Sequence, residues 1–142
     1  MDHLRDRDPQ HAPPLAGVHL AALAALVDDA HVHAGWAVRY AYARDRLPLA
    51  TFAVRAGRMP GTMPSAVICP GTHEEVAAVV RWARAAGVAL VPWGAGSGVL
   101  GGAIPLGGEA VLDLKRLNRL VEVDTLNGLA TCGAGMNGAQ FE

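Results

Sequence analysis

The sequence predicts an α+β protein in which an N-terminal helical segment is followed by a βαβ unit and a β-meander. Three observations carry this prediction. Residues 15 to about 46 are rich in alanine and leucine and poor in helix breakers. The middle part holds a short apolar run, an amphipathic helical pattern and a second apolar run. The last part holds three short strand-like runs separated by turn residues.

The composition suits one modest globular domain with a small-molecule partner. The chain has 142 residues, and a hydrophobic content of 51% is enough to form a buried core. Twelve lysine and arginine residues nearly balance thirteen aspartate and glutamate residues, without a run of like charges. We therefore expect no nucleic-acid partner and no membrane insertion, while a homo-oligomer or a partner subunit stays open.

The cysteines and the leader predict a cytoplasmic protein. Cys69 and Cys132 lie far apart and outside any Cys-x-x-Cys spacing, as is typical of reduced thiols. The leader has balanced charges, unlike the basic start of a secretory signal peptide. The apolar run Leu15–Val27 is too short to span a bilayer.

The first two regions of the chain are expected at residues 1–14 and 15–62. Residues 1–14 are polar and hold three of the nine prolines, which favours a disordered lead-in. Residues 15–62 are expected to be a helical segment and a linker. Leu15–Arg46 predicts two helices or one interrupted helix, Pro48 is expected to end the helical zone, and Arg55–Ser65 is rich in glycine and proline as linkers are.

The third region, residues 63–142, begins with the βαβ unit. A strand is expected at Ser65–Pro70 and a second, buried strand at Val88–Pro92. The helix between them has both ends signalled, because Thr72 and Glu75 have the spacing of a capping box and Gly87 can cap the C-terminus. The two strands of such a unit run parallel with a right-handed crossover.

The expected meander consists of Ala110–Leu114, Leu120–Asp124 and Leu129–Gly135. Asn127-Gly128 lies between the last two runs and is a strong hairpin signal. Residues 135–142 look like the start of a helix with nothing after it to pack against, so we expect the sequence to be truncated.

The glycine-rich stretch Val91–Gly102 is the main candidate for a functional site. Gly96–Gly101 matches G-x-G-x-x-G, but a Rossmann fingerprint needs a helix to begin inside the motif, and Pro105, Gly107 and Gly108 disfavour a helix. A P-loop is excluded, because no Gly-Lys-Ser or Gly-Lys-Thr is present. A plain turn and a backbone nest for an anion such as pyrophosphate both stay open. The position after a buried strand of a βαβ unit favours the nest.

The same residues carry a family resemblance. The stretches VPWGAGSGVLGGAIP, VLDLKRLNRLVEVD and ATCGAGMNGAQFE resemble the first half of the FAD-binding domain in the vanillyl-alcohol oxidase and p-cresol methylhydroxylase (PCMH) family of FAD-linked oxidases. The sequence is most similar to the branches of the glycolate oxidase subunit, D-lactate dehydrogenase and alkyldihydroxyacetone-phosphate synthase. The resemblance spans about residues 64–142 and implies the N-terminal half of a PCMH-type FAD-binding domain.

The resemblance implies that backbone amides of the glycine-rich loop hold the FAD pyrophosphate. It also implies that FAD is held non-covalently, because some relatives attach flavin through a histidine in this loop and none occurs between His73 and Glu142. The hydroxyl of Ser97 is expected to donate to a phosphate oxygen. Trp93 stands where many members have arginine or a small apolar residue, which favours an apolar wall. The cofactor-binding residues implied are Pro92, Trp93, Gly94, Ala95, Gly96, Ser97, Gly98, Gly101 and Gly102.

By the same resemblance, the chain is the FAD-binding N-terminal part of a flavin-dependent oxidoreductase. Its substrate would be a small 2-hydroxy acid or one like that of alkyldihydroxyacetone-phosphate synthase. The alternative is a non-catalytic fragment or an FAD-binding subunit that needs a partner chain. We assign no catalytic residue, because the flavin carries the redox chemistry, and we expect the fragment alone to be inactive.

Two other clusters are expected to be ordinary surface. His31 and His33 lie beside Asp28 and Asp29, but residues at i and i+2 of a helix point to different faces, so we expect no metal site. The tyrosines and arginines of Arg39–Arg46 are explained by an amphipathic surface helix.

Overall fold

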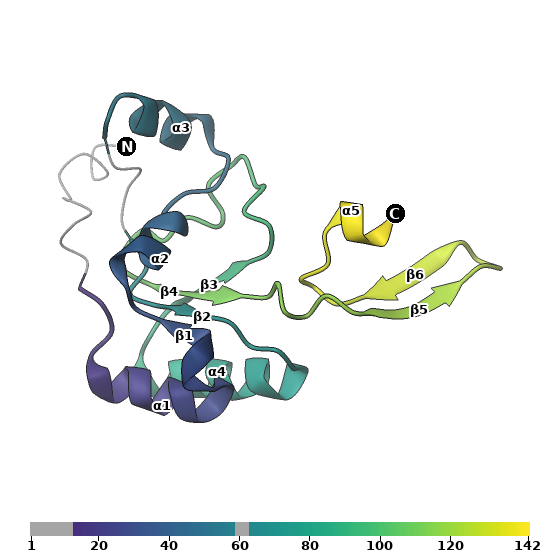
Figure 1. Cartoon of the computed structure of the whole chain (residues 1–142), viewed down its shortest axis with the longest axis horizontal. Coiled ribbons are helices and arrows are strands. Elements are labelled where there is room, and N and C mark those ends of the chain that lie inside the picture. The colour runs from purple at the N-terminus through teal and green to yellow at the C-terminus, as the bar shows by residue number, and fades with distance from the viewer. Residues whose placement is uncertain (1–12, 59–62) are drawn as a thin grey trace.

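A four-stranded sheet forms the centre of the protein (Figure 1). The computed structural model describes residues 13–58 and 63–142, so the expectations for residues 1–12 of the lead-in and 59–62 of the linker lie outside the described residues. The sheet strands are β1 (Val32–His33), β2 (Val67–Ile68), β3 (Leu90–Trp93) and β4 (Ala110–Asp113). The helices are α1 (Gly17–Val27), the 3-10 helix η3 (Asp29–His31), α2 (Trp36–Ala41), α3 (Pro48–Arg55), α4 (His73–Ala86) and α5 (Gly138–Phe141). A separate hairpin consists of β5 (Leu120–Asp124) and β6 (Leu129–Cys132).

The order of the sheet is β1-β2-β4-β3. β1 is antiparallel to β2, whereas β2 and β3 both run parallel to β4. The expected βαβ unit is therefore present, but β4 lies between its two strands. This corrects the expectation that Ala110–Leu114 begins a meander, because the antiparallel part is limited to β5 and β6. The reason is burial: Ala110, Val111 and Leu112 are at most 6% exposed, and strands covered on both faces belong inside a parallel sheet.

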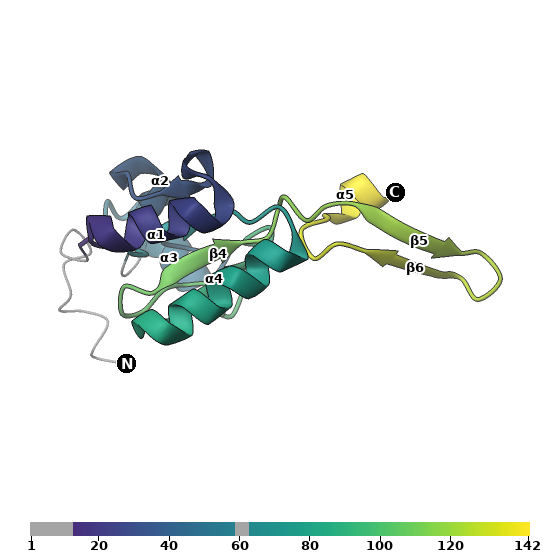
Figure 2. The ribbon, with the colours of Figure 1, turned by 90° about the horizontal axis from the view of Figure 1, so that it is seen from below.

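The two faces of the sheet pack on different helices, because successive strand residues point to opposite sides. Figure 2 shows α1 and α4 on the same face. The core on that face consists of Leu23, Val27, Ile68, Val79, Ala110 and Leu112. The opposite face packs on α2 and the segment after it, and its core consists of Val67, Trp93 and Val111 with Val38 and Tyr42 against them.

Both predicted ends of α4 are confirmed. The Thr72 hydroxyl oxygen accepts a hydrogen bond from the Glu75 backbone N–H at 3.1 Å, and the Glu75 carboxylate accepts one from the Gly71 N–H at 2.7 Å. Gly87 ends the helix in the left-handed conformation, with φ +66°. These local signals determine where α4 begins and ends. They therefore also limit where β2 can end before it and where β3 can begin after it.

The N-terminal segment differs from the prediction in two places. Two helices are present between residues 15 and 46, but η3 and β1 separate them, so His31 and His33 are not on one helix. Pro48 begins α3 instead of ending the helical zone. Proline suits the first position of a helix because its missing N–H would have no partner there.

The β5–β6 hairpin extends away from the sheet (Figures 1 and 2). Its turn confirms the hairpin signal, with φ +68° at Gly128. All residues of its two strands except Asp124 are exposed. In the part of the chain that the structure describes, no helix is both long enough and apolar enough to cross a membrane.

Candidate functional site

The glycine-rich stretch leaves the sheet at the edge where its parallel strands end. β2, β3 and β4 run in one direction, so their carboxyl ends meet at a single edge. Open α/β sheets bind ligands in the crevice outside these ends. The glycine loop, residues 94–102, starts directly after β3 and lacks helix and strand. The chain thus places a glycine-rich loop at the edge where a ligand site is expected.

The conformation of the glycine loop depends on Gly96 and Trp93. Gly96 has φ +63°, and a Cβ built on it would lie 2.4 Å from Cζ2 of Trp93. A side chain at this position would therefore collide with the indole ring in addition to the strain of a positive φ. Trp93 is 6% exposed and packs edge-on against Tyr42, with ring centroids 5.0 Å apart. The indole ring therefore packs beneath Gly96 and supports the loop.

The backbone amides of the glycine loop are unpaired. Within the described residues, no backbone N–H from Gly94 to Ala103 donates a hydrogen bond. Gly94, Ala95, Ser97 and Gly98 are exposed, so a ligand can approach this stretch of backbone. A row of free N–H groups in a loop with positive φ values is the arrangement of an anion-binding nest. These residues fit a pyrophosphate group without any charged side chain.

The segment between α2 and α3 lies against the glycine loop. The backbone N–H of Arg46 donates to the Gly98 carbonyl at 2.9 Å, and a Cβ built on Gly101 would lie 3.4 Å from Cδ2 of Leu47. The Asp45 carboxylate approaches Gly98 from the same side. The N-terminal segment therefore forms part of the site, although no motif in the sequence pointed to it.

A partly buried cluster of Tyr42, Asp113 and Lys115 joins the N-terminal segment to the carboxyl end of β4. The Tyr42 hydroxyl donates to Oδ2 of Asp113, whose residue is 3% exposed. Nζ of Lys115 lies 3.1 Å from the same oxygen and donates to the Tyr42 hydroxyl at 2.9 Å. Burial and then the hydrogen bond to Asp113 raise the pKa of Tyr42. Burial by itself lowers the pKa of the Lys115 ammonium group. The hydrogen bonds to Tyr42 and Asp113 outweigh this effect, so that the pKa of Lys115 is raised.

The surface-helix interpretation of Arg39–Arg46 is wrong for two of its residues. Arg39 is 4% exposed, and its Nε donates to the Pro64 carbonyl at 2.6 Å. Tyr42 is half-buried and bonded to Asp113. The helical spacing showed an amphipathic pattern, but only the tertiary fold shows that its polar side chains have partners.

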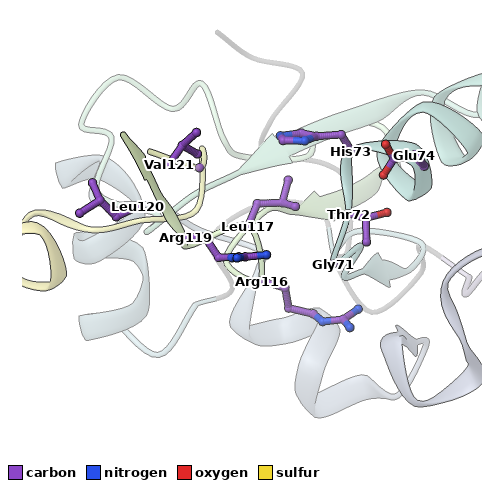
Figure 3. Close-up of a pocket in the computed structure, with 10 residues that line it drawn as sticks. Gly71, Thr72, His73, Glu74, Arg116, Leu117, Arg119, Leu120 and Val121 are labelled. Atoms are coloured by element: carbon purple, nitrogen blue, oxygen red, sulfur yellow. The ribbon is translucent and has the colours of Figure 1, made fainter. Parts of the chain in front are cut away.

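A cavity of about 490 Å³ opens at the same edge of the sheet, between the start of α4 and the chain after β4 (Figure 3). Arg116 and Arg119 line it, and Nη1 of Arg116 donates to the Cys69 carbonyl at 2.6 Å. The glycine loop does not line this cavity. The edge therefore has two separate parts, a backbone nest after β3 and a basic hollow after β2 and β4.

The predicted cofactor-binding residues fall into two groups. Pro92, Gly94, Ala95, Ser97, Gly98 and Gly102 are exposed, whereas Trp93 is buried and Gly96 and Gly101 are half-buried. Gly101 has φ +82°, so glycine is required there for the turn. In the described part of the chain, no group of three or more metal-ligating side chains is present. Cys69 and Cys132 are free thiols.

Comparison with known proteins gives one family and a consistent set of relatives. The family model described as FAD binding domain matches residues 64–142. D-2-hydroxyglutarate dehydrogenase of Xanthomonas citri pv. viticola is 48% identical over 73 residues, which are 51% of this chain and 16% of that protein. Alkyldihydroxyacetonephosphate synthase of Dictyostelium discoideum is 30% identical over 92 residues, which are 63% of this chain and 15% of that protein. The chain thus spans about a sixth of the length of these relatives.

Solved structures match the fold over most of the chain. One of alkyldihydroxyacetonephosphate synthase has a TM-score of 0.80 at 24% identity and covers 92% of this chain and 27% of its own. One of p-cresol methylhydroxylase has a TM-score of 0.73 at 22% identity and covers 86% of this chain and 22% of its own. At these identities the likeness concerns the fold alone. It confirms the mixed helix-and-sheet fold expected from the sequence.

Proposed function

The chain belongs to the FAD binding domain family, and from that premise we propose that it is the FAD-binding N-terminal part of a flavin-dependent oxidoreductase. Membership confirms the resemblance found in the glycine-rich stretch and FAD as the cofactor of the family. The proposal assigns the FAD pyrophosphate to the glycine loop, and assigns cofactor contacts to the nine residues Pro92–Gly98, Gly101 and Gly102. FAD is held there non-covalently.

The row of unpaired amides after β3 carries this proposal. Backbone N–H groups from Gly94 to Ala103 donate to nothing in the described part of the chain. Their loop follows the parallel strand β3, which lies at the edge of the sheet and is only partly buried, unlike the buried strand expected from the sequence. Unpaired donors are tolerated when water or a ligand satisfies them. A pyrophosphate presents several acceptor oxygens within the span of one such loop, which makes it a suitable ligand.

The chain's own residues bind and orient the cofactor. Gly96 and Gly101 hold the turns that align the N–H groups, and Trp93 supports the loop from below. The hydroxyl of Ser97 is exposed and available as a further donor. Bound flavin supplies the electron-transfer chemistry, and none of these residues has to act as an acid, base or nucleophile.

The substrate of the whole enzyme follows from two kinds of relative. The relative that is 48% identical is a D-2-hydroxyglutarate dehydrogenase, which supports a small 2-hydroxy acid as the substrate. Alkyldihydroxyacetonephosphate synthase of Dictyostelium discoideum matches over a longer stretch of 92 residues, which supports a substrate like that of this enzyme. The proposal includes both classes, and a cytoplasmic location.

Direct binding of FAD tests the proposal. Isothermal titration calorimetry of the 142-residue chain with FAD is expected to give saturable binding that inorganic pyrophosphate weakens by competition. Gly96→Ala is expected to raise the Kd for FAD at least about tenfold, because its Cβ would lie 2.4 Å from the Trp93 ring at a positive φ.

Gly35→Ala is the matched control, since a Cβ on Gly35 would meet nothing within 4 Å and the residue lies outside the loop. This variant is expected to bind FAD as the wild type does. A folded wild-type chain that ignores both FAD and pyrophosphate, or a Gly96→Ala chain that binds FAD normally, would contradict the assignment of the loop.

The second candidate is an FAD-binding subunit or fragment that needs further protein to complete its site. The β5–β6 hairpin favours it, because Val121, Val123 and Leu129 are 67%, 55% and 64% exposed. Such a surface is usually covered by other protein. Under this candidate, the chain alone binds pyrophosphate weakly and retains FAD only after the covering protein is added.

A further inference from the structure

Asp45 has a carboxylate oxygen that is buried and unpaired. The residue is 5% exposed, and Oδ1 accepts a hydrogen bond from the Leu47 backbone N–H at 2.8 Å. Oδ2 is buried and has no hydrogen-bond partner, and among the buried polar side-chain atoms of the described residues only Oγ of Ser65 also lacks one. A buried carboxylate oxygen without a donor is costly, so native sites rarely keep one unless a ligand supplies the donor.

This oxygen lies beside the glycine loop. A Cβ built on Gly98 would lie 3.5 Å from Oδ2, and the N–H of the next residue, Arg46, donates to the Gly98 carbonyl. Gly98 carries no side chain that could cover the carboxylate. Within the described residues, the only other backbone hydrogen bond of residues 94–102 runs from the Ile104 N–H to the Gly101 carbonyl, so few backbone bonds hold the loop. A ligand on the loop would reach Oδ2 from the side of Gly98, where no side chain stands between them.

The chemistry of a carboxylate restricts which part of a ligand it can bind. An ionised carboxylate only accepts hydrogen bonds, and it repels the negative charges of a pyrophosphate. Building on the proposed function, we propose that Asp45 is a further cofactor-binding residue whose Oδ2 accepts a hydrogen bond from a sugar-alcohol hydroxyl of FAD. FAD offers such hydroxyls on both sides of its pyrophosphate, in the ribityl chain and in the adenosine ribose.

The test compares ligands that share phosphate groups but differ in hydroxyls. Asp45→Asn keeps an oxygen for the Leu47 N–H and replaces the second acceptor by an N–H₂ donor. We expect it to raise the Kd for FAD about tenfold or more, as loss of a charge-assisted hydrogen bond does. It is expected to leave the Kd for inorganic pyrophosphate unchanged. A loss shared by FMN places the contact at the ribityl chain, whereas a loss shared by ADP places it at the ribose.

A second variant and a control keep the result interpretable. Asp45→Ser keeps a side-chain oxygen for the Leu47 N–H but is too short to replace Oδ2, so it is expected to show the same ligand selectivity. Asp29→Asn makes the same exchange at an exposed residue of η3, outside the glycine loop, and is expected to change no Kd. Circular dichroism and thermal unfolding confirm that the compared chains are folded.

Two outcomes overturn the inference while leaving the proposed function in place. The first is a wild-type chain that binds FAD and an Asp45→Asn chain that binds it equally well. The second is an equal loss for FAD and pyrophosphate, which would show that Asp45 acts only on the shape of the loop. Failure of the wild-type chain to bind either ligand overturns the proposed function itself, and the inference with it.

Discussion

The Tyr42 hydroxyl connects the N-terminal segment to a carboxylate at the end of β4. Replacing it by Tyr42→Phe removes the donor to Asp113 and the acceptor for Lys115 while the ring still packs against Trp93. A hydrogen bond to a charged group contributes about 2 kcal/mol. We expect the free energy of unfolding in urea to fall by about this amount. Tyr40→Phe is the control, because the described contact of Tyr40 is ring stacking on Trp36, and it should change little.

The same cluster predicts a loss of stability at alkaline pH. The pKa of Tyr42 is raised above its ordinary value of 10.0, so folding favours the neutral phenol. That contribution is complete below about pH 10 and is lost as the pH rises through the raised pKa. The raised pKa of Lys115 acts in the same direction. Urea unfolding at pH 8 to 11 should show a smaller decline for Tyr42→Phe than for the wild type, and equal declines would contradict the role of the cluster.

Cys69 is expected to be unreactive near neutral pH. Burial and then the negative charge of Asp113 raise the pKa of its thiol to about 11. At pH 8 only on the order of one thiol in a thousand is then a thiolate, which is the reactive form. Mass spectrometry after iodoacetamide treatment should show the exposed Cys132 labelled first, with labelling of Cys69 increasing up to about pH 11. Equal labelling of both residues at pH 8 would contradict this environment.

The link between the hairpin and the sheet depends on two glycines. A Cβ on Gly135 would lie 1.9 Å from the Leu114 carbonyl oxygen, and one on Gly133 would lie 2.0 Å from that of Leu117. Gly135→Ala must therefore displace backbone, and we expect it to lower the free energy of unfolding by about 2 kcal/mol or more. Gly138→Ala serves as the control, because its Cβ would meet nothing within 4 Å. A Gly135→Ala chain as stable as this control would show that the hairpin contributes nothing to folding.

At the scale of single elements, the sequence predicted an element correctly where capping or turn residues indicated its ends. Thr72 and Gly87 bracket α4, and Asn127-Gly128 marks the β5–β6 turn, so both elements were predicted. Pro48 was misinterpreted because proline suits the first turn of a helix as well as the residue after one. The place of β4 depends on which strands it pairs with, although its apolar residues Ala110, Val111 and Leu112 were a signal for a buried strand.

For the whole molecule, protection from exchange should differ sharply between the sheet and the hairpin. β4 is buried and paired on both sides, whereas β5 and β6 pair only with each other and are exposed. A two-stranded hairpin is marginally stable alone. Hydrogen–deuterium exchange should therefore be at least about a hundredfold slower for residues 110–113 than for residues 120–124. Equal protection of the two segments would show that the hairpin is held as firmly as the sheet.

Only the part of the candidate site whose residues are contiguous in the sequence, the glycine loop, was predicted. The glycine loop could be recognised because its residues follow one another in sequence and its chemistry lies in the backbone. Asp45 and Tyr42 reach it from about fifty residues earlier in the chain, through the packing of α2 on the sheet. No spacing rule links such residues, so their role depends on the tertiary structure.

The position of β4 between β2 and β3 affects the order in which the chain can fold during synthesis. β3 and the glycine loop are translated before β4, yet β4 is the strand that pairs with β3 and donates the Leu114 N–H to the Trp93 carbonyl. A nascent chain that has emerged only to the loop has no partner for β3 in the described sheet. The nest therefore forms only after residues 110–114 have left the ribosome and β4 has inserted between β2 and β3, which were synthesised earlier. Such non-local pairing is slow, so capture of FAD during translation has to wait for β4.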